Sequence, residues 1–396
     1  MRLLFAGIHE GIVGGVETYL RRLVPELLAR GHECVYAFEL PRAHRDVPVV
    51  SPQSLLLDSN FLGHVAGFEP DVIVQSSLQD PRRELALGQR WPVVVFAHAY
   101  GGMCISGTRR HARPAPEVCS KRFGLECWKF YFTRRCGGLN PGTALSLYRE
   151  NQLRRQALLA ADAVVVASET MSDLVKTHGV PAELVTTIPY YVPPPPELTS
   201  SVVRTRHSAK RALFVGRLTD LKGWRLFLRA AAILRESGNE WTVVIAGDGP
   251  DREEVRTEAS RLKLRLELHP WLEPSARDAL MESATVLVIP STWPEPFGLV
   301  GLEAARLGVP TVAFDVGGIR DWLVPERTGL LARPGSSESL ASSIARSIED
   351  EIRYDRMSEE AQLQAQNFSV ERHVKALEAV LRRAAGRSSR NSCTTL

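Results

Sequence analysis

Long apolar runs are absent from this sequence of 396 residues. No stretch approaches the roughly 18–20 apolar residues that a membrane-spanning helix requires, and the apolar stretch at the N-terminus is too short for a signal peptide. Cysteine is also sparse. Six cysteines in a chain of this length do not make the disulfide framework of a secreted protein. We therefore expect a cytoplasmic protein of about two domains.

The chain also lacks the large positive charge of a nucleic-acid binder, since its formal net charge is only +4. Hydrophobic residues make up 44% and charged residues 24% of the sequence, which excludes a disordered chain. Positive charge is concentrated between residues 99 and 140, a segment with eight lysines and arginines and two glutamates. This segment predicts a local basic surface for an anionic partner, and we expect no nucleic acid to bind.

Strand and helix patterns alternate along the first half of the chain. An apolar run at 2–8 ends in glycines, and the apolar residues from Val16 to Leu28 then recur at the spacing of one helix face. A second apolar run at 34–40 completes a β-α-β unit, which implies a parallel sheet. Further strands are predicted at 71–76, 93–98, 163–168 and 184–189, and helices at 148–160 and 169–176.

Four consecutive prolines at 193–196 separate this half from a second one of the same kind, because such a run fits neither a helix interior nor a central strand. The alternation restarts at residue 211, so both halves are predicted to be α/β with doubly wound parallel sheets. In the second half we expect strands at 211–215, 241–246, 266–268, 286–290 and 310–314, and helices at 224–236, 251–262, 274–283, 297–307, 337–349, 358–366 and 370–385. The predicted boundaries are an N-terminal domain at 1–190 with an insert at 99–140, a linker at 191–210, a C-terminal domain at 211–368, a C-terminal helix at 369–386 and a tail at 387–396.

Two glutamates flank the predicted start of the helix at 297–307. Glu295 lies in the proline-rich loop P-S-T-W-P-E-P-F-G, and Glu303 lies on the second turn of the helix. A helix start offers unpaired N–H groups and a partial positive charge, which suit an anion such as a diphosphate. The two carboxylates can accept hydrogen bonds from two hydroxyl-bearing parts of one ligand. By themselves, such glutamates more often only complement the helix dipole or face solvent.

Two cations flank the loop that follows the strand at 211–215. In the segment V-G-R-L-T-D-L-K-G, Gly216 allows a close approach of the backbone, and Arg217 and Lys222 follow the carboxyl end of the strand. Ligands of doubly wound sheets bind at this end of the strands. Two fixed cations can neutralise a departing diphosphate, although alone they are more often surface cations of a loop.

The first half contributes a glycine-rich turn and a histidine. Residues 11–17, which include Gly15, lead into the first helix, but they do not form the G-x-G-x-x-G fingerprint of dinucleotide-binding proteins. Glu39 is also a poor candidate for a ribose ligand. His98 lies at the carboxyl end of the strand at 93–98, where polar groups of such sheets act. A lone histidine at this position is more often structural.

Taken together and in this order, the motifs resemble those of one family. The combination comprises G-G-V-E-T-Y-L, His98, V-G-R-L-x-x-x-K-G, A-G-D-G-P and E-P-F-G-L-V-G-L-E-A. It is similar to the retaining glycosyltransferases of family 4, whose E-x7-E motif corresponds here to Glu295 and Glu303. The resemblance is strong over 203–349 and weak over 100–141. It implies the GT-B fold, in which two Rossmann-like doubly wound domains face an interdomain cleft.

The resemblance implies a role for each matched residue. His98 would contact the donor sugar near the reacting carbon, and Gly15 would let the N-terminal loop approach the phosphates or the acceptor. The glycine that binds the base in the family is replaced within L-H-P-W, so a UDP-sugar and a GDP-sugar both stay open as donors. The resemblance also implies that Glu295 and the backbone of Phe297, Gly298 and Leu299 contact the donor sugar. Glu303 would bind the ribose hydroxyls. Gly216, Arg217 and Lys222 would surround the diphosphate.

The reaction implied by the resemblance is transfer of a sugar from a nucleotide sugar to a hydroxyl of a glycan, a lipid-linked saccharide or a small glycoside, as in surface polysaccharide biosynthesis. No metal or further cofactor would be required. The N-terminal domain would bind the acceptor and the C-terminal domain the donor, and the last helix would pack back on the N-terminal domain. Retention would follow front-face attack, so Glu295 is not assigned as a nucleophile.

The insert holds four cysteines, Cys104, Cys119, Cys127 and Cys136, without the paired C-x2-C spacing of common zinc sites. A structural zinc or disulfide cluster and thiols packed in a loop are both open. The run W-K-F-Y-F lies beside the cations, which suits an anionic acceptor or peripheral contact with the inner face of the membrane. A solvated, partly packed loop is the alternative.

The sequence also bears on two other classes of function, an oxidoreductase and a binding protein without activity. A dinucleotide-dependent oxidoreductase is disfavoured by the missing glycine fingerprint and by the cations Arg217 and Lys222. A catalytically silent binding partner would be expected to have lost Glu295, Glu303 or one of these cations, and the sequence retains all four. Turnover of a nucleotide sugar separates this last possibility from an enzyme.

Overall fold

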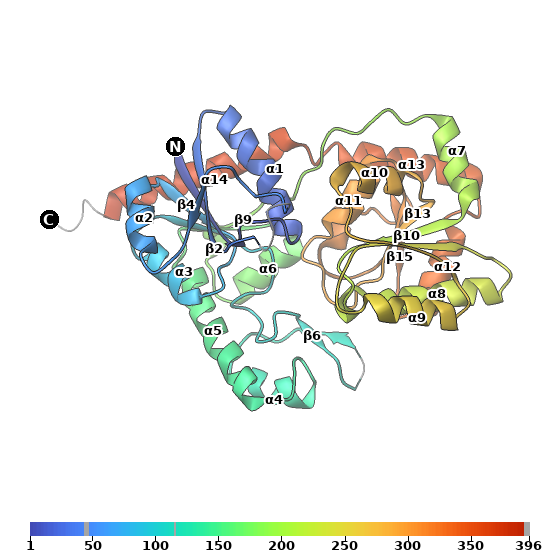
Figure 1. The fold of residues 1–396 in the computed structure, drawn as a ribbon, viewed down its shortest axis with the longest axis horizontal. Helices are drawn as coiled ribbons and strands as arrows, with labels where there is room; N and C mark the ends of the chain where they lie inside the picture. Colours follow the sequence, from blue (N-terminus) through green and yellow to red (C-terminus); the bar gives the residue numbers. More distant parts are fainter. Residues whose placement is uncertain (43–46, 115, 392–396) are drawn as a thin grey trace. The chain divides into compact units, whose positions relative to one another are not determined.

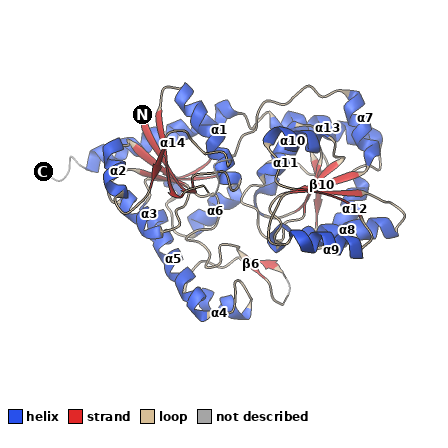
Figure 2. Cartoon of the chain, viewed as in Figure 1, coloured by secondary structure: helices blue, strands red, loops and turns tan. Residues whose placement is uncertain are grey.

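The computed structural model describes residues 1–42, 47–114 and 116–391, with side chains up to Gly386. The chain divides into two compact units. Unit 1 comprises Met1–Arg109, Ser120–Pro189 and Glu371–Leu396, and unit 2 comprises Arg110–Cys119 and Tyr190–Val370. In each unit, helices enclose the strands of a sheet (Figures 1 and 2).

The sheet of unit 1 is parallel throughout and has the strand order β3-β2-β1-β4-β5-β8-β9. Its inner strands are short apolar runs buried on both faces, as expected where helices cover a parallel sheet on both sides. The strands are β1 (Arg2–His9), β2 (Glu33–Leu40), β3 (Ser54–Leu56), β4 (Val72–Gln75), β5 (Val93–Phe96), β8 (Ala163–Val166) and β9 (Val185–Thr187).

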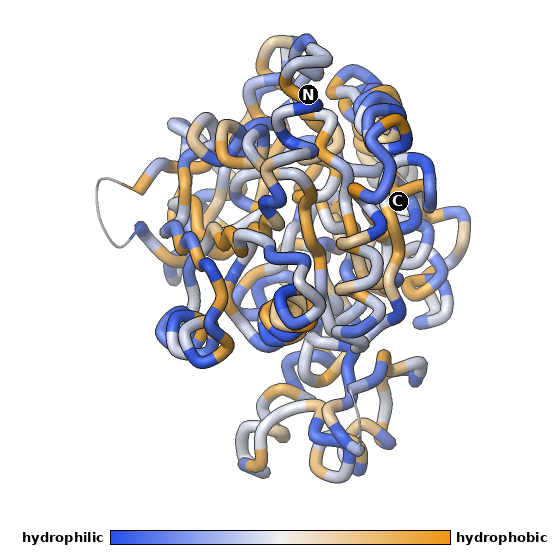
Figure 3. Tube along the Cα trace, turned by 90° about the vertical axis from the view of Figure 1, so that its right-hand side faces the viewer, coloured by the Kyte–Doolittle hydropathy of each residue, from blue (hydrophilic) through white to orange (hydrophobic). Residues whose placement is uncertain are grey.

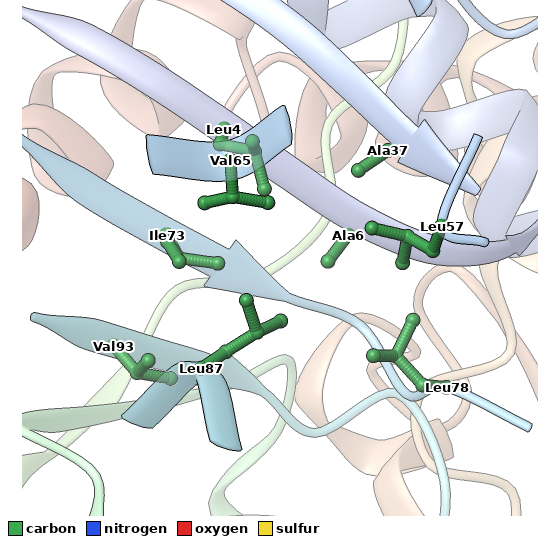
Figure 4. Packing of buried hydrophobic residues seen from close by; sticks show 9 residues of the cluster. All are labelled: Leu4, Ala6, Ala37, Leu57, Val65, Ile73, Leu78, Leu87 and Val93. Carbon is green, nitrogen blue, oxygen red and sulfur yellow. The ribbon is translucent and has the colours of Figure 1, made fainter. Parts of the chain in front are cut away.

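One core cluster of unit 1 joins this sheet to the helices on one face. Leu4 and Ile73 from neighbouring strands pack against Val65 and Leu87 from two helices, and all four are fully buried (Figure 4). The helices of unit 1 are α1 (Gly15–Ala29), α2 (Phe61–Phe68), α3 (Pro81–Gly88), α4 (Glu126–Thr133), α5 (Pro141–Ala160), α6 (Glu169–Thr177) and α14 (Val370–Asn391), with a 3-10 turn η1 (Ala182–Leu184).

Helix α14 is far from the rest of unit 1 in sequence and is held to it by buried polar contacts. The Tyr19 hydroxyl lies 2.7 Å from Nε2 of His373, and Nε2 of His32 lies 2.8 Å from Oε1 of Glu378. Both contacts join residues more than 340 positions apart. The last helix of the chain is therefore part of the first folded unit.

The sheet of unit 2 is also parallel throughout, in the order β12-β11-β10-β13-β14-β15. Its strands are β10 (Arg211–Val215), β11 (Thr242–Ala246), β12 (Arg265–His269), β13 (Val286–Ile289), β14 (Thr311–Phe314) and β15 (Gly329–Ala332). Its helices are α7 (Ser200–Ala209), α8 (Trp224–Glu236), α9 (Arg252–Arg261), α10 (Pro274–Glu282), α11 (Leu299–Arg306), α12 (Ser337–Arg346) and α13 (Glu351–Ala365), with 3-10 turns η2 (Asp220–Lys222) and η3 (Gly317–Asp321).

Two parallel-sheet, Rossmann-like units confirm the predicted α/β fold of the GT-B type. In each sheet the direction of strand succession reverses once, between β1 and β4 in unit 1 and between β10 and β13 in unit 2. Such a switch point leaves a crevice beyond the carboxyl ends of the two strands, where open α/β sheets bind their ligands. A ligand site is therefore expected at these two strand ends.

Among the predicted boundaries that differ from the structure are those of the linker, of α5 and of α14. The segment expected as a polar linker contains helix α7, which is held by the buried guanidinium of Arg206 on the carbonyl oxygens of Glu282 and Leu307. Helix α5 begins at Pro141 rather than residue 148, because Asn140 caps it and proline fits a first helical turn. Helix α14 continues to Asn391, and positions 392–396 of the predicted tail lie outside the described residues.

The insert is more ordered than the loop expected for it. It contains α4 and an antiparallel hairpin of β6 (Arg110–His111) and β7 (Glu117–Val118). Phe123 and Tyr131 form a small core with the first half of α5, and Trp128 and Phe132 pack against it. Hydrophobic and hydrophilic segments alternate along the insert, at the bottom of Figure 3. Most of the aromatic run is therefore occupied inside the insert, and a membrane contact would depend on its cations.

Candidate active site

The loops that follow β10 and β13 meet at the switch point of unit 2. The two strands pair directly, with Ala212 opposite Val286 and Leu213 opposite Leu287. The first loop carries Lys222 and the second carries Glu295. The Nζ atom of Lys222 lies 2.7 Å from Oε1 of Glu295, although the two residues are 73 positions apart.

The carboxylate of Glu295 is buried and held by side chains of its own loop as well as by Lys222. The indole N–H of Trp293 donates to Oε1 over 3.0 Å, and the hydroxyl of Ser291 donates to the same oxygen. The Lys222 ammonium also lies 5.2 Å from the centre of the Trp293 ring. Among the described residues, all side-chain hydrogen bonds to Glu295 end on Oε1.

The pKa of Glu295 reflects a balance of opposing effects. Burial alone would raise the pKa of this carboxyl, but the Lys222 charge and the hydrogen bonds from Lys222, Ser291 and Trp293 outweigh it and lower the pKa. Glu295 is therefore a carboxylate at neutral pH. A carboxylate that already accepts three charged or polar donors on one oxygen is suited to holding a ligand hydroxyl with the other oxygen.

Three glycine and backbone contacts fix the position of this pair. Gly223 has a φ of 73°, and a Cβ atom there would overlap the carbonyl oxygen of Pro290. The amide of Thr292 donates to the carbonyl oxygen of Leu221 over 2.9 Å. Gly317 has a φ of 60° and lies directly against the backbone of Glu295. The loops can approach this closely only because glycine stands at both contact positions.

Helix α11 begins beside Glu295 with its first N–H groups uncapped by a side chain. The helix starts at Leu299, two residues later than predicted, because Gly298 has a φ of 84° and forms the N-cap. The indole of Trp322 donates to the carbonyl oxygen of Phe297 over 2.7 Å and anchors the turn. Gly298 and Leu299 are half-buried. A helix start without a side-chain cap has free N–H groups of the kind that bind anions in other proteins.

Glu303, on the second turn of α11, is buried and bound to an arginine that the sequence did not indicate. Nη2 of Arg277, on α10, donates to Oε1 of Glu303 over 2.8 Å. The Nε atom of Arg277 is buried and has no hydrogen-bond partner among the described residues. Glu303 therefore belongs to a charged pair between two helices, and Arg277 retains an unused donor there.

The other predicted cation, Arg217, is exposed, and its guanidinium makes no ion pair within the described part of the chain. Its loop is packed backbone to backbone against the loop after β11. A Cβ atom on Gly247 would overlap the carbonyl oxygen of Gly216, and one on Gly249 would overlap that of Leu218. This explains the glycines of A-G-D-G-P and places Gly216 and Arg217 at the carboxyl end of β10.

In unit 1, His98 follows β5 and is partly buried among aromatic rings. Its ring stacks on Phe96 with centroids 4.2 Å apart, and its Nε2 lies 3.2 Å from the Ser76 hydroxyl at the end of β4. Burial and the neighbouring His373 lower the pKa of His98 to about 3. The imidazole is therefore neutral at physiological pH. Ser77, next to Ser76, has a φ of 117°, which is a strained value for a residue other than glycine.

His373 is the buried centre of a hydrogen-bonded chain next to His98. Its Nδ1 lies 2.7 Å from the carbonyl oxygen of Pro189, so Nδ1 carries the proton and donates. Its Nε2 then accepts from the hydroxyl of Tyr19, and the Tyr19 ring meets His98 edge to face with centroids 5.7 Å apart. Burial lowers the pKa of His373 to about 4. The contacts of His373 with Tyr19 and Pro189 were not predicted from the sequence, because helix α14 brings His373 from the far end of the chain.

Gly15 is the first residue of α1, and it is exposed. A Cβ atom there would meet nothing within 4 Å, so packing within the chain does not require glycine. The N-cap residue, Gly14, has no side chain, so the first N–H groups of α1 lack a side-chain cap. Glu17 lies in this first turn.

The structure does not assemble the zinc site considered for Cys104, Cys119, Cys127 and Cys136. Among the described residues, no group of three or more histidine, cysteine or acidic side chains is arranged to hold a metal ion. The Sγ atom of Cys104 accepts instead from the amide of Arg109 over 3.3 Å inside the insert. None of these four cysteines forms a disulfide in the structure, which contradicts the disulfide alternative. Over the described ranges, none of the helices combines the length and apolar character needed to cross a bilayer.

Several residues of this site were not singled out from the sequence. Ser291 and Trp293 had a local signal, since they precede Glu295 by four and two positions in the loop after β13. Gly317 and Arg277 had none, because their contacts with Glu295 and Glu303 arise only when separate elements pack together.

Each half of the chain matches a family model of glycosyltransferases. Residues 13–194 match the family model for Glycosyltransferase Family 4, and residues 199–364 match that for Glycosyl transferases group 1. Over 139 residues, or 35% of this chain, the sequence is 34% identical to the 2-deoxystreptamine glucosyltransferase of Streptomyces kanamyceticus. Over 54% of the chain it is 30% identical to the D-inositol 3-phosphate glycosyltransferase of Nocardia farcinica. These matches span 36% and 51% of the two relatives' lengths.

Solved structures share the fold over nearly the whole chain. The crystal structure of Anabaena HepE in complex with UDP and glucose aligns with a TM-score of 0.67 at 20% identity, and the alignment covers 96% of this chain and 99% of that one. Sucrose-phosphate synthase from Thermosynechococcus elongatus aligns over the full length of both chains with a TM-score of 0.71 at 18% identity. The chain therefore combines a Glycosyltransferase Family 4 domain in its first half with a Glycosyl transferases group 1 domain in its second half.

Proposed function

We propose that the chain transfers a hexosyl group from a nucleoside diphosphate sugar to a hydroxyl of an acceptor, with retention of configuration and without a metal. The observation that carries this proposal is the Lys222–Glu295 pair beside the uncapped start of α11, at the switch point of unit 2. The pair offers a cation, a carboxylate and backbone N–H groups in one place. A sugar joined to a diphosphate needs all three.

The leaving diphosphate is the group that these cations would stabilise. As the sugar–oxygen bond breaks, negative charge builds on the β-phosphate. Lys222, the unpaired Arg217 and the start of α11 offer positive charge that interacts more strongly with this transition state than with the intact donor. Removal of one such group is expected to cost about 2.7–4 kcal/mol of transition-state stabilisation. Because two side chains can supply the charge, no metal enters the scheme.

Glu295 is proposed to hold the donor sugar rather than to attack it. Its Oε1 is occupied by Lys222, Ser291 and Trp293, and its lowered pKa makes it a weak nucleophile. Oε2 would accept a sugar hydroxyl. The departing phosphate would then take the proton of the acceptor hydroxyl as that oxygen attacks from the same face, so configuration is retained without a covalent intermediate.

Glu303 is proposed to bind the ribose hydroxyls of the donor. Its partner Arg277 positions the side chain through a 2.8 Å contact to Oε1 of Glu303. UDP is the favoured nucleotide, because Anabaena HepE was crystallised with UDP. A GDP-sugar remains the alternative donor.

Unit 1 is proposed to bind the acceptor, with neutral His98 near the reacting carbon and the uncapped start of α1 at Gly15 near the phosphates. Neutral His98 can donate or accept a hydrogen bond without adding charge to the oxocarbenium-like sugar. The candidate acceptors are a glycan, a lipid-linked saccharide or a small glycoside. A role in polysaccharide biosynthesis, a cytoplasmic location and peripheral contact of the basic insert with anionic lipid stay predictions.

The experiment is a donor screen. The purified chain is incubated in EDTA with UDP-, GDP- and dTDP-sugars and candidate acceptors. Release of nucleoside diphosphate is followed, and the anomeric configuration of the product is read by NMR. We expect release from one class of donor, retention in the product, and loss of turnover in Lys222→Ala. Binding of donors without any turnover would favour a catalytically silent partner instead.

A further inference from the structure

Unit 1 contains a cavity that the proposed chemistry does not use. Its volume is about 920 Å³, and it lies beyond the carboxyl ends of β2 and β3. The start of α3 and one face of α5 form its walls, and these two helices pack side by side (Figure 1). A volume of this size falls in the range of small-molecule sites.

Part of the lining is apolar and exposed. Leu40 at the end of β2, Leu56 at the end of β3 and Leu145 on α5 all line the cavity. They are 38%, 40% and 36% exposed. Three half-exposed leucines around one hollow favour a ligand with a hydrocarbon part, because burying that part removes apolar surface from water on both sides.

Two arginines of the same cavity have no partner. Arg82, in the first turn of α3, and Arg149, on α5, are exposed, and neither guanidinium makes an ion pair or side-chain hydrogen bond among the described residues. The other charged side chains of the lining are engaged: Glu39 with Arg83 at 3.0 Å, Asp80 with the amide of Arg82 at 2.9 Å, Asp58 with the amide of Asn60 at 2.7 Å, and Glu150 with the Ser146 hydroxyl at 2.7 Å.

The two lining arginines that are unpaired among the described residues favour a ligand with negative charge. The lining has four carboxylates and three arginines, and one pair of them, Glu39 and Arg83, is joined directly. Arg82 and Arg149 can each still form an ion pair with an incoming anion. A phosphate can serve two separate guanidiniums, since it presents several oxygens in different directions. A neutral polyol would leave the arginines unpaired and the leucines in water.

We propose that this cavity binds an amphiphilic phosphate, in which a hydrocarbon chain contacts Leu40, Leu56 and Leu145 and the phosphate group contacts Arg82 and Arg149. That such a molecule is the sugar acceptor rests on the proposed function. The binding itself does not, because the cavity lies wholly in unit 1 and the cations proposed for the diphosphate, Arg217 and Lys222, lie in unit 2.

The test is a calorimetric titration with decyl phosphate, kept below the concentration at which it forms micelles. Inorganic phosphate and decanol are titrated separately, because each carries only half of the proposed ligand. We expect one molecule of decyl phosphate to bind per chain, at least about tenfold more tightly than either comparison ligand. Arg82→Gln and Arg149→Gln should each weaken binding about tenfold or more, and Leu145→Asn should weaken binding of decyl phosphate but not of phosphate.

Matched variants outside the cavity control for charge and apolarity. Arg90 is an exposed arginine just after α3, and Leu159, on α5, is 39% exposed. Neither lines the cavity, so Arg90→Gln and Leu159→Asn should bind decyl phosphate like the wild type. Thermal unfolding of every variant identifies any that fails to fold.

Two results would overturn the inference. The first is decyl phosphate binding that is absent or equal to that of inorganic phosphate. The second is binding only to vesicles of anionic lipid, which would mark a membrane surface rather than a cavity. Titration of UDP into the same samples separates this failure from failure of the proposed function, because UDP would still bind to unit 2.

Discussion

Gly317 passes so close to Glu295 that the amide of the next residue, Gly318, donates to the carbonyl oxygen of Glu295 over 2.8 Å. Turn η3, which begins at Gly317, and the loop after β13 therefore position the buried carboxylate together. Any side chain at Gly317 would have to displace the backbone of Glu295.

Substitution Gly317→Ala is therefore expected to damage the donor site. The added Cβ overlaps the Glu295 backbone, and the φ of 60° is itself unfavourable for alanine. We expect the free energy of unfolding to fall by about 2–3 kcal/mol and donor binding to weaken. The control is Gly335→Ala, where φ is 75° but no atom lies within 4 Å of the new Cβ. Equal losses in the two variants, by urea unfolding and donor titration, would refute a specific role for Gly317.

Replacement of Lys222 separates its catalytic contribution from its structural one. In Lys222→Met, turnover should drop about 10²–10³-fold because the cation near the leaving group is lost. The control Lys176→Met removes an exposed lysine of α6 and should leave turnover unchanged. A Lys222→Met enzyme within about twofold of wild type would contradict the assignment.

The same variant should change the pH dependence of stability. Without Lys222, burial dominates and raises the pKa of Glu295, whereas in the wild type that pKa is lowered. Near pH 7 the variant then buries an uncompensated carboxylate, and we expect a deficit of about 2 kcal/mol. As pH falls toward the raised pKa, Glu295 takes up a proton in the folded variant and the deficit shrinks. Urea unfolding at pH 7 and at pH 5 measures this, and a deficit that grows on acidification would have the wrong sign.

Glu303 is expected to act through binding rather than through the chemical step. Glu303→Gln should raise the KM for the donor about 10–100-fold with a smaller effect on kcat, because a hydrogen bond to the ribose contributes equally to the ground and transition states. Glu254→Gln, which loses an exposed pair with Arg225 on α8, serves as the control. A Glu303→Gln enzyme with unchanged KM and reduced kcat would place Glu303 at the reacting atoms instead.

His373 should make unit 1 sensitive to acid. Its pKa of about 4 in the folded state lies below the ordinary value of 6.5, so the unfolded chain binds more protons between these two values. Its contribution is full above pH 6.5 and is lost as pH falls toward 4, which amounts to about 2 kcal/mol between pH 7 and pH 5. His373→Gln should lose less stability over this range than the wild type. Identical pH slopes for the two proteins would contradict a buried neutral His373.

Much of the fold could be predicted because the signals are local. Helix α8 runs from Trp224 to Glu236 as its apolar spacing indicated. The strand-end rule led to Lys222, whose contact with Glu295 is present in the structure, and to His98, and their roles stay predictions. Helix α7 was missed because its sequence is polar. Its buried Val203 and Arg206 tie it to unit 2, and so does His207, whose Nε2 lies 3.0 Å from the carbonyl oxygen of Ile348.

The unpredicted parts of the site depend on contacts between distant segments. The start of α11 was placed two residues early because glycine at 298 gives no sign, in a sequence alone, of its positive φ. Arg277 and His373 each meet their partners only after separate helices pack, over separations of 26 and 354 positions. No local pattern encodes such pairs, and a single sequence carries no other trace of them.

The most direct test of the central claim is a calorimetric titration of nucleoside diphosphate sugars into the wild-type chain in EDTA, with Glu303→Gln and Lys222→Met in parallel. The account predicts that one class of nucleotide sugar binds with a stoichiometry of one without added metal, and that Glu303→Gln weakens this binding by about tenfold or more. Absence of binding by every nucleotide sugar, or binding that neither substitution changes, would contradict the assignment of the donor site to Lys222, Glu295 and Glu303.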